Sequence, residues 1–444
     1  MSNKTCMTTL ACALALAGAA AAIAAPAPAP AAAPVEIGSY YTAWSTESGF
    51  RLKQLDQAGV AGRFTFLNYA FANLYKMPDN TYRCDTGRDI KEAADGGGMR
   101  ATLDYARPFT AAESVDGTAD SASQPLAGNF NQLRQLKAKH PKLKVMLAIG
   151  GAEWSRWFSA GAATAPLRRA LVSSCIDLYI KGDLPVLNGH GGKGAAAGLF
   201  DGFDIDWEYP GVPLMAYNTI SPSDKENFTL LLAEFRSQLN ALGKKQRKKY
   251  YLTAAVNSGA KTTDATEPGK YIKSLDWINL MTYDFHGGWT KQGPTGFHSN
   301  LYPDPGSPDT DKQSVHTGVE RFLKLGVPAK KLVIGVPFYA RGWTGVPAVR
   351  YGLYQGATGP AKGFEEGTEK YSTISARKAP KFYHPVSKQL WTYDNGTFWT
   401  YDDPLVIKEK AAYVRDHRLG GMMSWALDQD DAGFALSKAM LEAQ

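Results

Sequence analysis

The residues that could do chemistry are concentrated in one short acidic segment. Residues 201–210 read DGFDIDWEYP, so that Asp204, Asp206 and Glu208 alternate with apolar residues. Because alternate side chains of a β-strand share one face, we expect these three carboxyl groups to point together, with Phe203, Ile205 and Trp207 on the opposite face. Neighbouring carboxyl groups raise one another's pKa, so one of them can stay protonated near neutral pH and serve as a general acid.

Two other interpretations of this acidic segment have to be weighed. Alternating acids could mark a solvated edge strand, although the apolar residues on the other face favour a strand that is covered on both sides. The carboxylates could also hold a metal ion, although no histidine accompanies them. We therefore expect a catalytic site that uses neither a metal nor another cofactor.

The elements that must position these carboxyl groups alternate along the chain. Apolar, β-branched stretches predict eight strands, which are Val35–Tyr41, Phe64–Phe71, Leu143–Gly150, Leu199–Glu208, Tyr250–Asn257, Leu275–Asp284, Leu332–Tyr339 and Gly420–Leu427. Helical patterns between them predict Phe50–Ala58, Asn129–His140, Pro166–Lys181, Ser223–Leu242, Gln313–Leu325 and Pro404–His417. Eight strand–helix repeats predict an α/β fold of the TIM (β/α)8 barrel type. An open doubly wound sheet is the alternative, but no Gly-rich phosphate loop follows the first strand.

Local signals refine this pattern in three places. Ser223 and Glu226 have the spacing of a capping box, and Gly243 is expected to end the helix that they begin. Residues 72–128 are long, polar and Gly-rich, and we expect them to build on the catalytic face of the barrel. Residues 342–403 are predicted to form a small α+β insertion, with a tight hairpin at Asn395-Gly396.

Composition is that of a large folded domain without a nucleic-acid partner. The chain has 444 residues, of which 44% are hydrophobic and 20% are charged, with a net charge of +7. The only dense basic cluster is Lys244–Lys249, which we interpret as a solvated helix end. The sequence also predicts a monomer, and none of its later segments is long and apolar enough to make the membrane a partner.

The amino terminus has the features of an export signal. Lys4 precedes an apolar stretch from Leu10 to Ile23, and small residues follow at Ala22 and Ala24. This pattern predicts a cleaved signal peptide over 1–24, a Pro/Ala linker over 25–34 and a secreted catalytic domain over 35–444. Removal of the signal peptide leaves two cysteines, Cys84 and Cys175. They could form one disulfide in an oxidising compartment or remain two separate thiols.

Several motifs in order along the chain resemble those of glycoside hydrolase family eighteen, the chitinases. Asp201 to Glu208 matches the motif D-G-x-D-x-D-x-E of the family, and the resemblance covers nearly all of residues 35–444. The further motifs are KVMLAIGG from Lys144 to Gly151, MTYD from Met281 to Asp284, GVPFYAR from Gly335 to Arg341, and Trp425. The insertion after Arg341 is similar to that of the bacterial secreted subfamily with deep clefts.

This resemblance implies hydrolysis of chitin or chito-oligosaccharides by a retaining, substrate-assisted mechanism, in which the 2-acetamido oxygen of the substrate attacks the anomeric carbon. Glu208 would protonate the glycosidic oxygen and later act as the base toward water. Asp206 would hold the acetamido N–H and stabilise the oxazolinium ion, and Asp204 would share a proton with Asp206. Tyr283 would donate a hydrogen bond to the acetamido carbonyl oxygen.

The resemblance also implies a set of substrate-binding residues. Asp284 and Arg341 would contact polar groups of the sugars, Trp425 would form the floor, and Trp44 and Trp289 would flank the cleft as stacking platforms. The complete set is Tyr40, Trp44, Phe71, Gly151, Trp154, Met281, Asp284, Trp289, Arg341 and Trp425. Trp207 points outward and is expected in the core.

One position departs from the family pattern. Relatives often carry Trp directly after the two glycines of the third strand, whereas this chain has Ala152, followed by Glu153 and Trp154. Binding on the leaving-group side is either weaker here or supplied by Trp154. We expect no separate carbohydrate-binding module in the chain.

Two related functions are the alternatives. An endo-β-N-acetylglucosaminidase would share the acidic motif, but it is not expected to carry the insertion together with MTYD. A non-catalytic chitin-binding lectin would lack the acid, whereas Glu208 is present. The sequence leaves open whether cleavage is internal or from chain ends.

Overall fold

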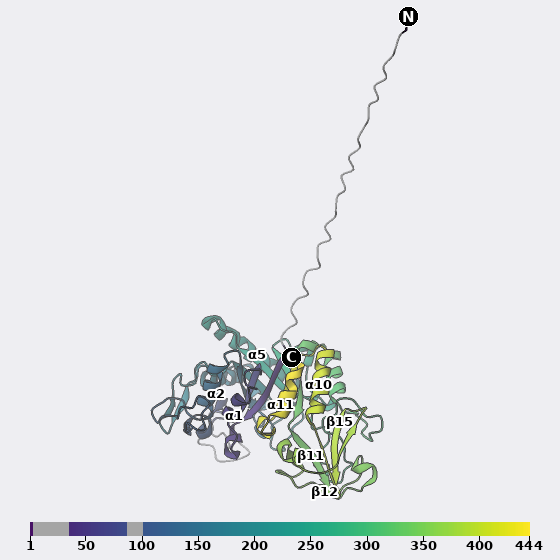
Figure 1. The fold of residues 1–444 in the computed structure, drawn as a ribbon. Helices are drawn as coiled ribbons and strands as arrows, with labels where there is room; N and C mark the ends of the chain where they lie inside the picture. The colour runs from purple at the N-terminus through teal and green to yellow at the C-terminus, as the bar shows by residue number, and fades with distance from the viewer. Residues whose placement is uncertain (3–34, 87–100) are drawn as a thin grey trace. The chain divides into compact units, whose positions relative to one another are not determined.

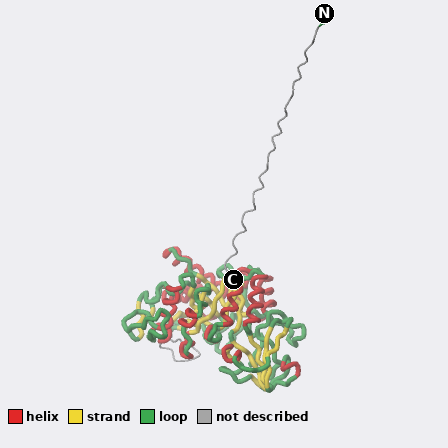
Figure 2. Tube along the Cα trace, in the orientation of Figure 1, coloured by secondary structure: helices red, strands yellow, loops and turns green. Residues whose placement is uncertain are grey.

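A closed barrel of eight parallel strands forms the centre of the computed structural model, which describes residues 1–2, 35–86 and 101–444. Each barrel strand hydrogen-bonds to the next, and the last strand returns to the first. Figure 2 shows helices on the outside of these strands. In order around the barrel, the strands are β1 (Glu36–Thr42), β2 (Phe66–Lys76), β4 (Lys144–Gly150), β7 (Gly202–Asp206), β8 (Tyr251–Asn257), β9 (Trp277–Met281), β10 (Leu332–Pro337) and β17 (Gly421–Trp425).

The predicted TIM barrel is therefore confirmed, and each of the eight expected strands overlaps one barrel strand. The signal peptide and most of the linker that the sequence predicts lie outside the described residues. Among the residues that are described, no helix is both long enough and apolar enough to span a bilayer.

The expected alternation along β7 is present. Phe203 and Ile205 are fully buried, and Phe203 packs edge-on against Phe235 of the helix α5 (Asp224–Gln246). Beyond the strand, Trp207 is buried as predicted and stacks on Phe158, with ring centroids 5.4 Å apart. Asp204 and Asp206 are left on the barrel side.

Helices connect the strands close to the predicted positions. The longer ones are α2 (Gly128–Lys139), α4 (Ala165–Cys175), α5, α8 (Val315–Lys324) and α10 (Pro404–Asp416). The shorter ones are α1 (Leu52–Gln57), α3 (Phe158–Ala162), α6 (Ala260–Asp264), α7 (Pro268–Tyr271), α9 (Tyr371–Ser375) and α11 (Ala435–Met440). The expected helix 166–181 changes after Cys175 into a π-helical turn, Ile176–Ile180.

The start of α5 is confirmed, because Ser223 is its N-cap residue, but the predicted capping box and the predicted end of the helix are wrong. Ser223 makes no side-chain cap hydrogen bond, and the neighbouring Asp224 carboxylate accepts from the backbone N–H groups of Ser221 and Gly211. Gly243 does not end the helix either. The helix continues to Gln246 and ends at Arg247, which adopts a left-handed conformation.

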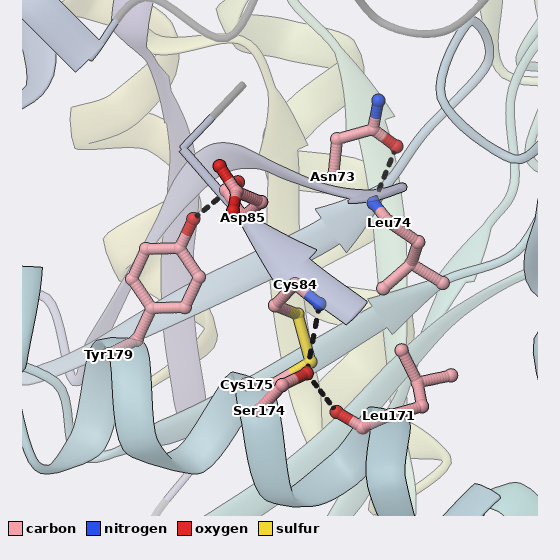
Figure 3. Close-up of a disulfide and its surroundings, with 8 residues drawn as sticks. All are labelled: Asn73, Leu74, Cys84, Asp85, Leu171, Ser174, Cys175 and Tyr179. Carbon is pink, nitrogen blue, oxygen red and sulfur yellow. Dashed lines mark hydrogen bonds between the residues drawn. A yellow bond between two sulfur atoms is a disulfide. The ribbon is translucent and has the colours of Figure 1, made fainter. Parts of the chain in front are cut away.

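A disulfide fixes the hairpin that extends β2 beyond the barrel. β2 runs five residues further than predicted because Asn73–Lys76 pair antiparallel with β3 (Tyr82–Asp85). Cys84 of β3 is bonded to Cys175 at the end of α4 (Figure 3), with the two Cα atoms 4.9 Å apart. The backbone N–H of Cys84 also donates to the Ser174 hydroxyl at 3.0 Å. The disulfide, one of the two alternatives left open by the sequence, is thus the one present.

The insertion between β10 and α10 forms a second sheet (Figure 1). Its strands follow the order β12-β11-β16-β15-β14, and β13 pairs with β11. The Asn395-Gly396 hairpin joins β15 to β16 as predicted, with both residues at positive φ. The strands are β11 (Tyr339–Thr344), β12 (Gly359–Pro360), β13 (Thr368–Lys370), β14 (Lys381–His384), β15 (Gln389–Asp394) and β16 (Thr397–Tyr401). A further small hairpin pairs β5 (Leu184–Leu187) with β6 (His190–Gly192).

Removal of the disulfide should destabilise the fold. It closes a loop with a sequence separation of 91 residues, and a cross-link of this kind typically stabilises by about 2–4 kcal/mol. We expect the double variant Cys84→Ser/Cys175→Ser to lose about that much free energy of unfolding in urea. The wild-type protein with reductant should behave like the variant. Equal unfolding midpoints for the oxidised wild type and the variant would contradict this expectation.

Candidate active site

Asp204 is the innermost carboxylate and receives hydrogen bonds from four barrel strands. Its Oδ2 accepts from the hydroxyl of Tyr40 at 2.5 Å and from the amide of Asn68 at 3.2 Å. Its Oδ1 accepts from Thr253 at 2.5 Å and from Asn279 at 2.9 Å. These donors lie on β1, β2, β8 and β9, so the closed barrel itself brings them to one carboxylate.

Asp206 is the last residue of β7, and Glu208 lies just beyond the carboxyl end of this strand. Asp206 is buried, and its Oδ1 has no hydrogen-bond partner among the described residues. Glu208 is buried except for 8% of its surface. Its backbone is fixed at both ends, since its N–H donates to the Ser155 hydroxyl at 2.9 Å and its carbonyl accepts from the Asn218 amide at 3.1 Å.

Burial and mutual repulsion keep protons on this carboxyl cluster. Burial raises the pKa of Asp204, although the hydrogen bonds from Thr253, Tyr40 and Asn279 oppose it. Burial and the charges of Glu208 and Asp204 raise the pKa of Asp206 well above its usual value. Burial raises the pKa of Glu208 to about 7, with a smaller contribution from the charge of Asp284. Glu208 can thus hold a transferable proton near neutral pH.

A charged pair joins the barrel to the insertion beside these acids. Arg341 of β11 binds Asp284 in a bidentate manner, with Nε–Oδ1 at 2.7 Å and Nη2–Oδ2 at 2.8 Å. Burial acts to raise the pKa of Asp284, but the Arg341 guanidinium and His298 outweigh it and hold this pKa well below its usual range. Tyr283 next to it is buried, and burial together with Asp206 raises its pKa. Its hydroxyl therefore remains a hydrogen-bond donor.

Aromatic side chains surround the carboxyl cluster. Phe71 stacks on Trp425, with ring centroids 5.5 Å apart and an interplanar angle of 18°. Trp44 and Trp154 each approach the Phe71 ring at 6.3 Å, and Tyr40 approaches Trp425 at 5.4 Å. One buried cluster contains the expected substrate-binding residues Tyr40, Phe71 and Met281 together with Tyr283, and Trp44, Trp154 and Trp425 are partly buried against it.

The remaining expected residues lie beside this cluster. Gly151 has φ +86°, and a Cβ atom there would come within 2.7 Å of the Phe71 ring, so glycine is required for this close approach. Its N–H donates to the carbonyl of Asp206 at 2.8 Å. Trp289 is 56% exposed, and the Arg341 guanidinium lies 5.2 Å from its ring centre.

The sequence did not reveal several residues that hold the acids in place. Asn68, Thr253 and Asn279 lie inside predicted strands. A polar side chain on the inner face of such a strand is the sequence feature that could have identified each of them. Ser155 and Asn218 act on the Glu208 backbone from loops, so no spacing pattern identifies them. The Tyr209 hydroxyl lowers the pKa of Glu208 by hydrogen bonding, against the larger effect of burial.

Within residues 35–86 and 101–444, no group of three or more His, Cys, Asp and Glu side chains is arranged to hold a metal ion. The arrangement supports proton transfer by carboxyl groups in a buried, aromatic-walled site.

The chain is similar to several known proteins. The model of the family "Glycosyl hydrolases family 18" matches residues 36–430. Chitinase A1 of Niallia circulans is 33% identical over 89% of this chain, and Chitinase C of Streptomyces lividans is 36% identical over 90%. The matches span 56% and 58% of those two relatives.

A solved structure is similar to this chain over almost the whole length of both proteins. The catalytic domain of psychrophilic chitinase B from Arthrobacter TAD20 is 40% identical, with a TM-score of 0.86. The match covers 92% of this chain and 95% of that domain.

The hydrogen bond from Tyr40 to Asp204 can be tested against a matched tyrosine. Tyr40 and Tyr41 are equally buried, but Tyr41 donates to the neutral Asn129 side chain at 2.8 Å. Because hydrogen bonds to charged groups contribute about 1.5–3 kcal/mol and neutral ones about 1 kcal/mol, Tyr40→Phe should lower the free energy of unfolding more than Tyr41→Phe. Only Tyr40→Phe should also lower turnover. Equal effects of both variants on turnover would remove Tyr40 from the site.

Proposed function

The chain belongs to the glycosyl hydrolases of family 18, and we propose that it is a chitinase that hydrolyses β-1,4-linked N-acetylglucosamine polymers. Because this chain spans about 56–60% of the length of the first curated chitinases that it matches, their activity is carried over as a proposal. The observation that supports it most is Glu208, a buried acid with its pKa raised to about 7 beside two further carboxyl groups.

Glu208 acts as the general acid and then as the general base. As the acid it protonates the glycosidic oxygen when the bond breaks, which requires a carboxyl group that is still protonated at the working pH. Once ionised, it can take a proton from the incoming water. Ser155 and Asn218 support this role because they fix the backbone from which the side chain projects.

The nucleophile is the 2-acetamido oxygen of the substrate. Two-carboxylate retaining glycosidases use the second carboxylate for attack, and family 18 is an exception in which the substrate assists. Asp206 holds the acetamido N–H and stabilises the oxazolinium ion, for which its unpartnered Oδ1 is available. The neutral Tyr283 hydroxyl donates a hydrogen bond to the acetamido carbonyl oxygen and positions that oxygen for attack on the anomeric carbon. Proton sharing between Asp204 and Asp206 remains a prediction.

The aromatic cluster and the Asp284–Arg341 pair bind the sugars. Trp425 and Phe71 form an apolar floor, and the exposed Trp289 serves as a stacking platform at the rim. Ala152 offers no ring on the leaving-group side. Trp154, which packs edge-on against Phe71, takes that place.

Secretion fits this function, since chitin is an insoluble extracellular polymer. The Cys84–Cys175 disulfide supports it, because disulfides persist in oxidising compartments and are rare in reducing ones.

The role of Glu208 is tested by Glu208→Gln, which keeps the shape but cannot donate the proton. We expect hydrolysis of chito-oligosaccharides to fall by several orders of magnitude, with binding measured by calorimetry nearly unchanged. Glu153→Gln, an exposed change on a nearby loop, is the matched control and should keep wild-type activity. A Glu208→Gln enzyme with a tenth of wild-type turnover would remove Glu208 from this role.

Substrate assistance predicts both a chemical requirement and a stereochemical result. The sugar before the scissile bond must carry an acetamido group, so fully deacetylated chitosan and cellulose oligomers should be inert. The oxazolinium ion shields one face, and the first product should be the β-anomer in proton NMR before mutarotation. Initial release of the α-anomer, or efficient cleavage of deacetylated oligomers, would contradict the roles of Asp206 and Tyr283.

A further inference from the structure

The face of the insertion that carries Arg341 continues beyond the Asp284–Arg341 pair. β11 and β13 pair antiparallel, and Arg341 lies opposite Thr368. Tyr339 lies opposite Lys370 in the same pairing. Because directly opposite residues of an antiparallel pair share one face of the sheet, Thr368 and Lys370 lie on the same side as Arg341. Arg341 also donates from Nη1 to the Thr368 hydroxyl at 2.6 Å. The face of the insertion that borders the acids therefore extends to Lys370.

Lys370 connects this face to the end of the last barrel strand. Its ammonium group forms an ion pair with Asp428, with Nζ–Oδ2 at 3.0 Å. Asp428 follows shortly after Trp425, the last residue of β17, and its side chain is only 6% exposed. A second ion pair, besides Arg341–Asp284, thus joins the same face of the insertion to the carboxyl ends of the barrel strands. This is the end of the barrel at which active sites of the fold lie.

Phe364 extends this face into solvent. The Lys370 ammonium group lies over the Phe364 ring, 5.5 Å from its centre, and Phe364 is 44% exposed. Since one face of the ring is turned to the ammonium group, the exposed surface belongs to the other face and to the ring edge. The arrangement repeats that of Trp289, an exposed ring with the Arg341 guanidinium 5.2 Å from its centre. Each exposed ring lies beside a cation that is ion-paired to the barrel.

The chain around Phe364 is held in place by backbone hydrogen bonds. The N–H of Thr368 donates to the Glu365 carbonyl at 3.0 Å, which closes a tight turn directly after Phe364. The N–H of Gly342 donates to the Gly367 carbonyl at 3.0 Å, which ties this turn to β11. A ring presented from an ordered turn loses little conformational freedom when a ligand stacks on it.

The turn that carries Phe364 also touches the loop that carries Trp289. A Cβ atom on Gly288 would come within 3.3 Å of the Gly367 Cα and within 2.7 Å of the Pro360 Cβ. The two exposed rings therefore belong to adjoining segments of one surface. Exposed apolar side chains that occur singly are ordinary. Phe364 differs from them because it continues the wall of the proposed sugar-binding site.

We propose that Phe364 is a further sugar-stacking residue, which binds an N-acetylglucosamine unit remote from the scissile bond. The faces of a pyranose ring carry C–H groups, which suit a flat apolar ring. The Lys370–Asp428 pair separates Phe364 from Trp425, so the sugar on Phe364 is not the direct neighbour of the sugar on Trp425. Only a longer chain can reach both rings. This inference rests on the proposed function, and Phe364 lies outside every motif that carries the family resemblance.

The test compares substrates of different length. The measured quantity is the ratio of kcat/KM for the hexamer of N-acetylglucosamine to kcat/KM for a chromogenic chitobioside. Phe364→Ala should lower this ratio about two- to tenfold, which corresponds to the loss of one stacking contact. The affinity for the hexamer, measured by calorimetry in the Glu208→Gln background, should fall by a similar factor.

An exposed tyrosine of the same insertion is the matched control. Tyr351 is 57% exposed, and its ring stacks on Phe382 with the centroids 4.1 Å apart. It has neither the contact with Lys370 nor a place on the face that carries Arg341. Tyr351→Ala should therefore leave the ratio at its wild-type value. An equal fall of the ratio in Tyr351→Ala and Phe364→Ala would overturn the inference.

Two further variants separate stacking from simple cover of the Lys370 side chain. Phe364→Tyr keeps a flat ring and should keep the wild-type ratio. Phe364→Leu keeps an apolar cover without a flat ring, and its ratio should fall as in Phe364→Ala. A wild-type ratio in folded Phe364→Leu would show that Phe364 only shields Lys370 and would overturn the inference, even if Phe364→Ala does not fold.

The outcomes also separate this inference from the proposed function. A wild-type protein that cleaves neither substrate would refute the proposed function and the sugar-binding role of Phe364 with it. A wild-type protein that cleaves both, with a ratio that Phe364→Ala and Phe364→Leu leave unchanged, would overturn the inference alone and leave the proposed function intact.

Discussion

The hydrogen bonds to Asp204 are the interaction on which the rest of the site depends. Three carboxyl groups inside one barrel repel one another and lose hydration, so their charges must be compensated or neutralised by protons. The barrel supplies four donors to Asp204, whereas Oδ1 of Asp206 has none among the described residues. Within the described part of the chain, the Asp204 carboxylate thus has hydrogen-bond donors on both of its oxygens, unlike the Asp206 carboxylate. Burial raises the pKa of all three carboxyl groups, and at Asp204 these hydrogen bonds oppose the effect of burial.

This distribution explains why the complete barrel and its insertion are both needed. The donors to Asp204 come from β1, β2, β8 and β9, which meet only when the barrel is closed. The stacked Phe71 and Trp425 rings form an apolar wall beside the acids. The insertion contributes Arg341 through its first strand, and its bidentate contact holds the Asp284 charge that acts on Glu208.

The sequence predicted those parts of the molecule that follow from periodicity. Alternation along residues 201–208 gave the shared face of the acids, and apolar stretches gave all eight barrel strands, because both depend on local geometry. The end of α5 was missed because glycine also occurs inside helices, and here the helix passes through Gly243 to Gln246. The capping box was missed because Ser223, although it is the N-cap residue, makes no side-chain cap hydrogen bond. Ser155 and Tyr209 were missed because they approach the acids across space from a loop or from the next position along the chain.

The proton affinity of Glu208 in the wild-type protein is the quantity that tests this view of the site most directly. It can be measured by carbon-13 NMR of the side-chain carboxyl groups between pH 3 and pH 9, with the signal assigned by its absence in Glu208→Gln. An acid whose pKa is raised by burial and by the charge of Asp284 should titrate near pH 7. Titration of Glu208 below about pH 5, as for an ordinary exposed glutamate, would contradict its assignment as the acid that holds the catalytic proton.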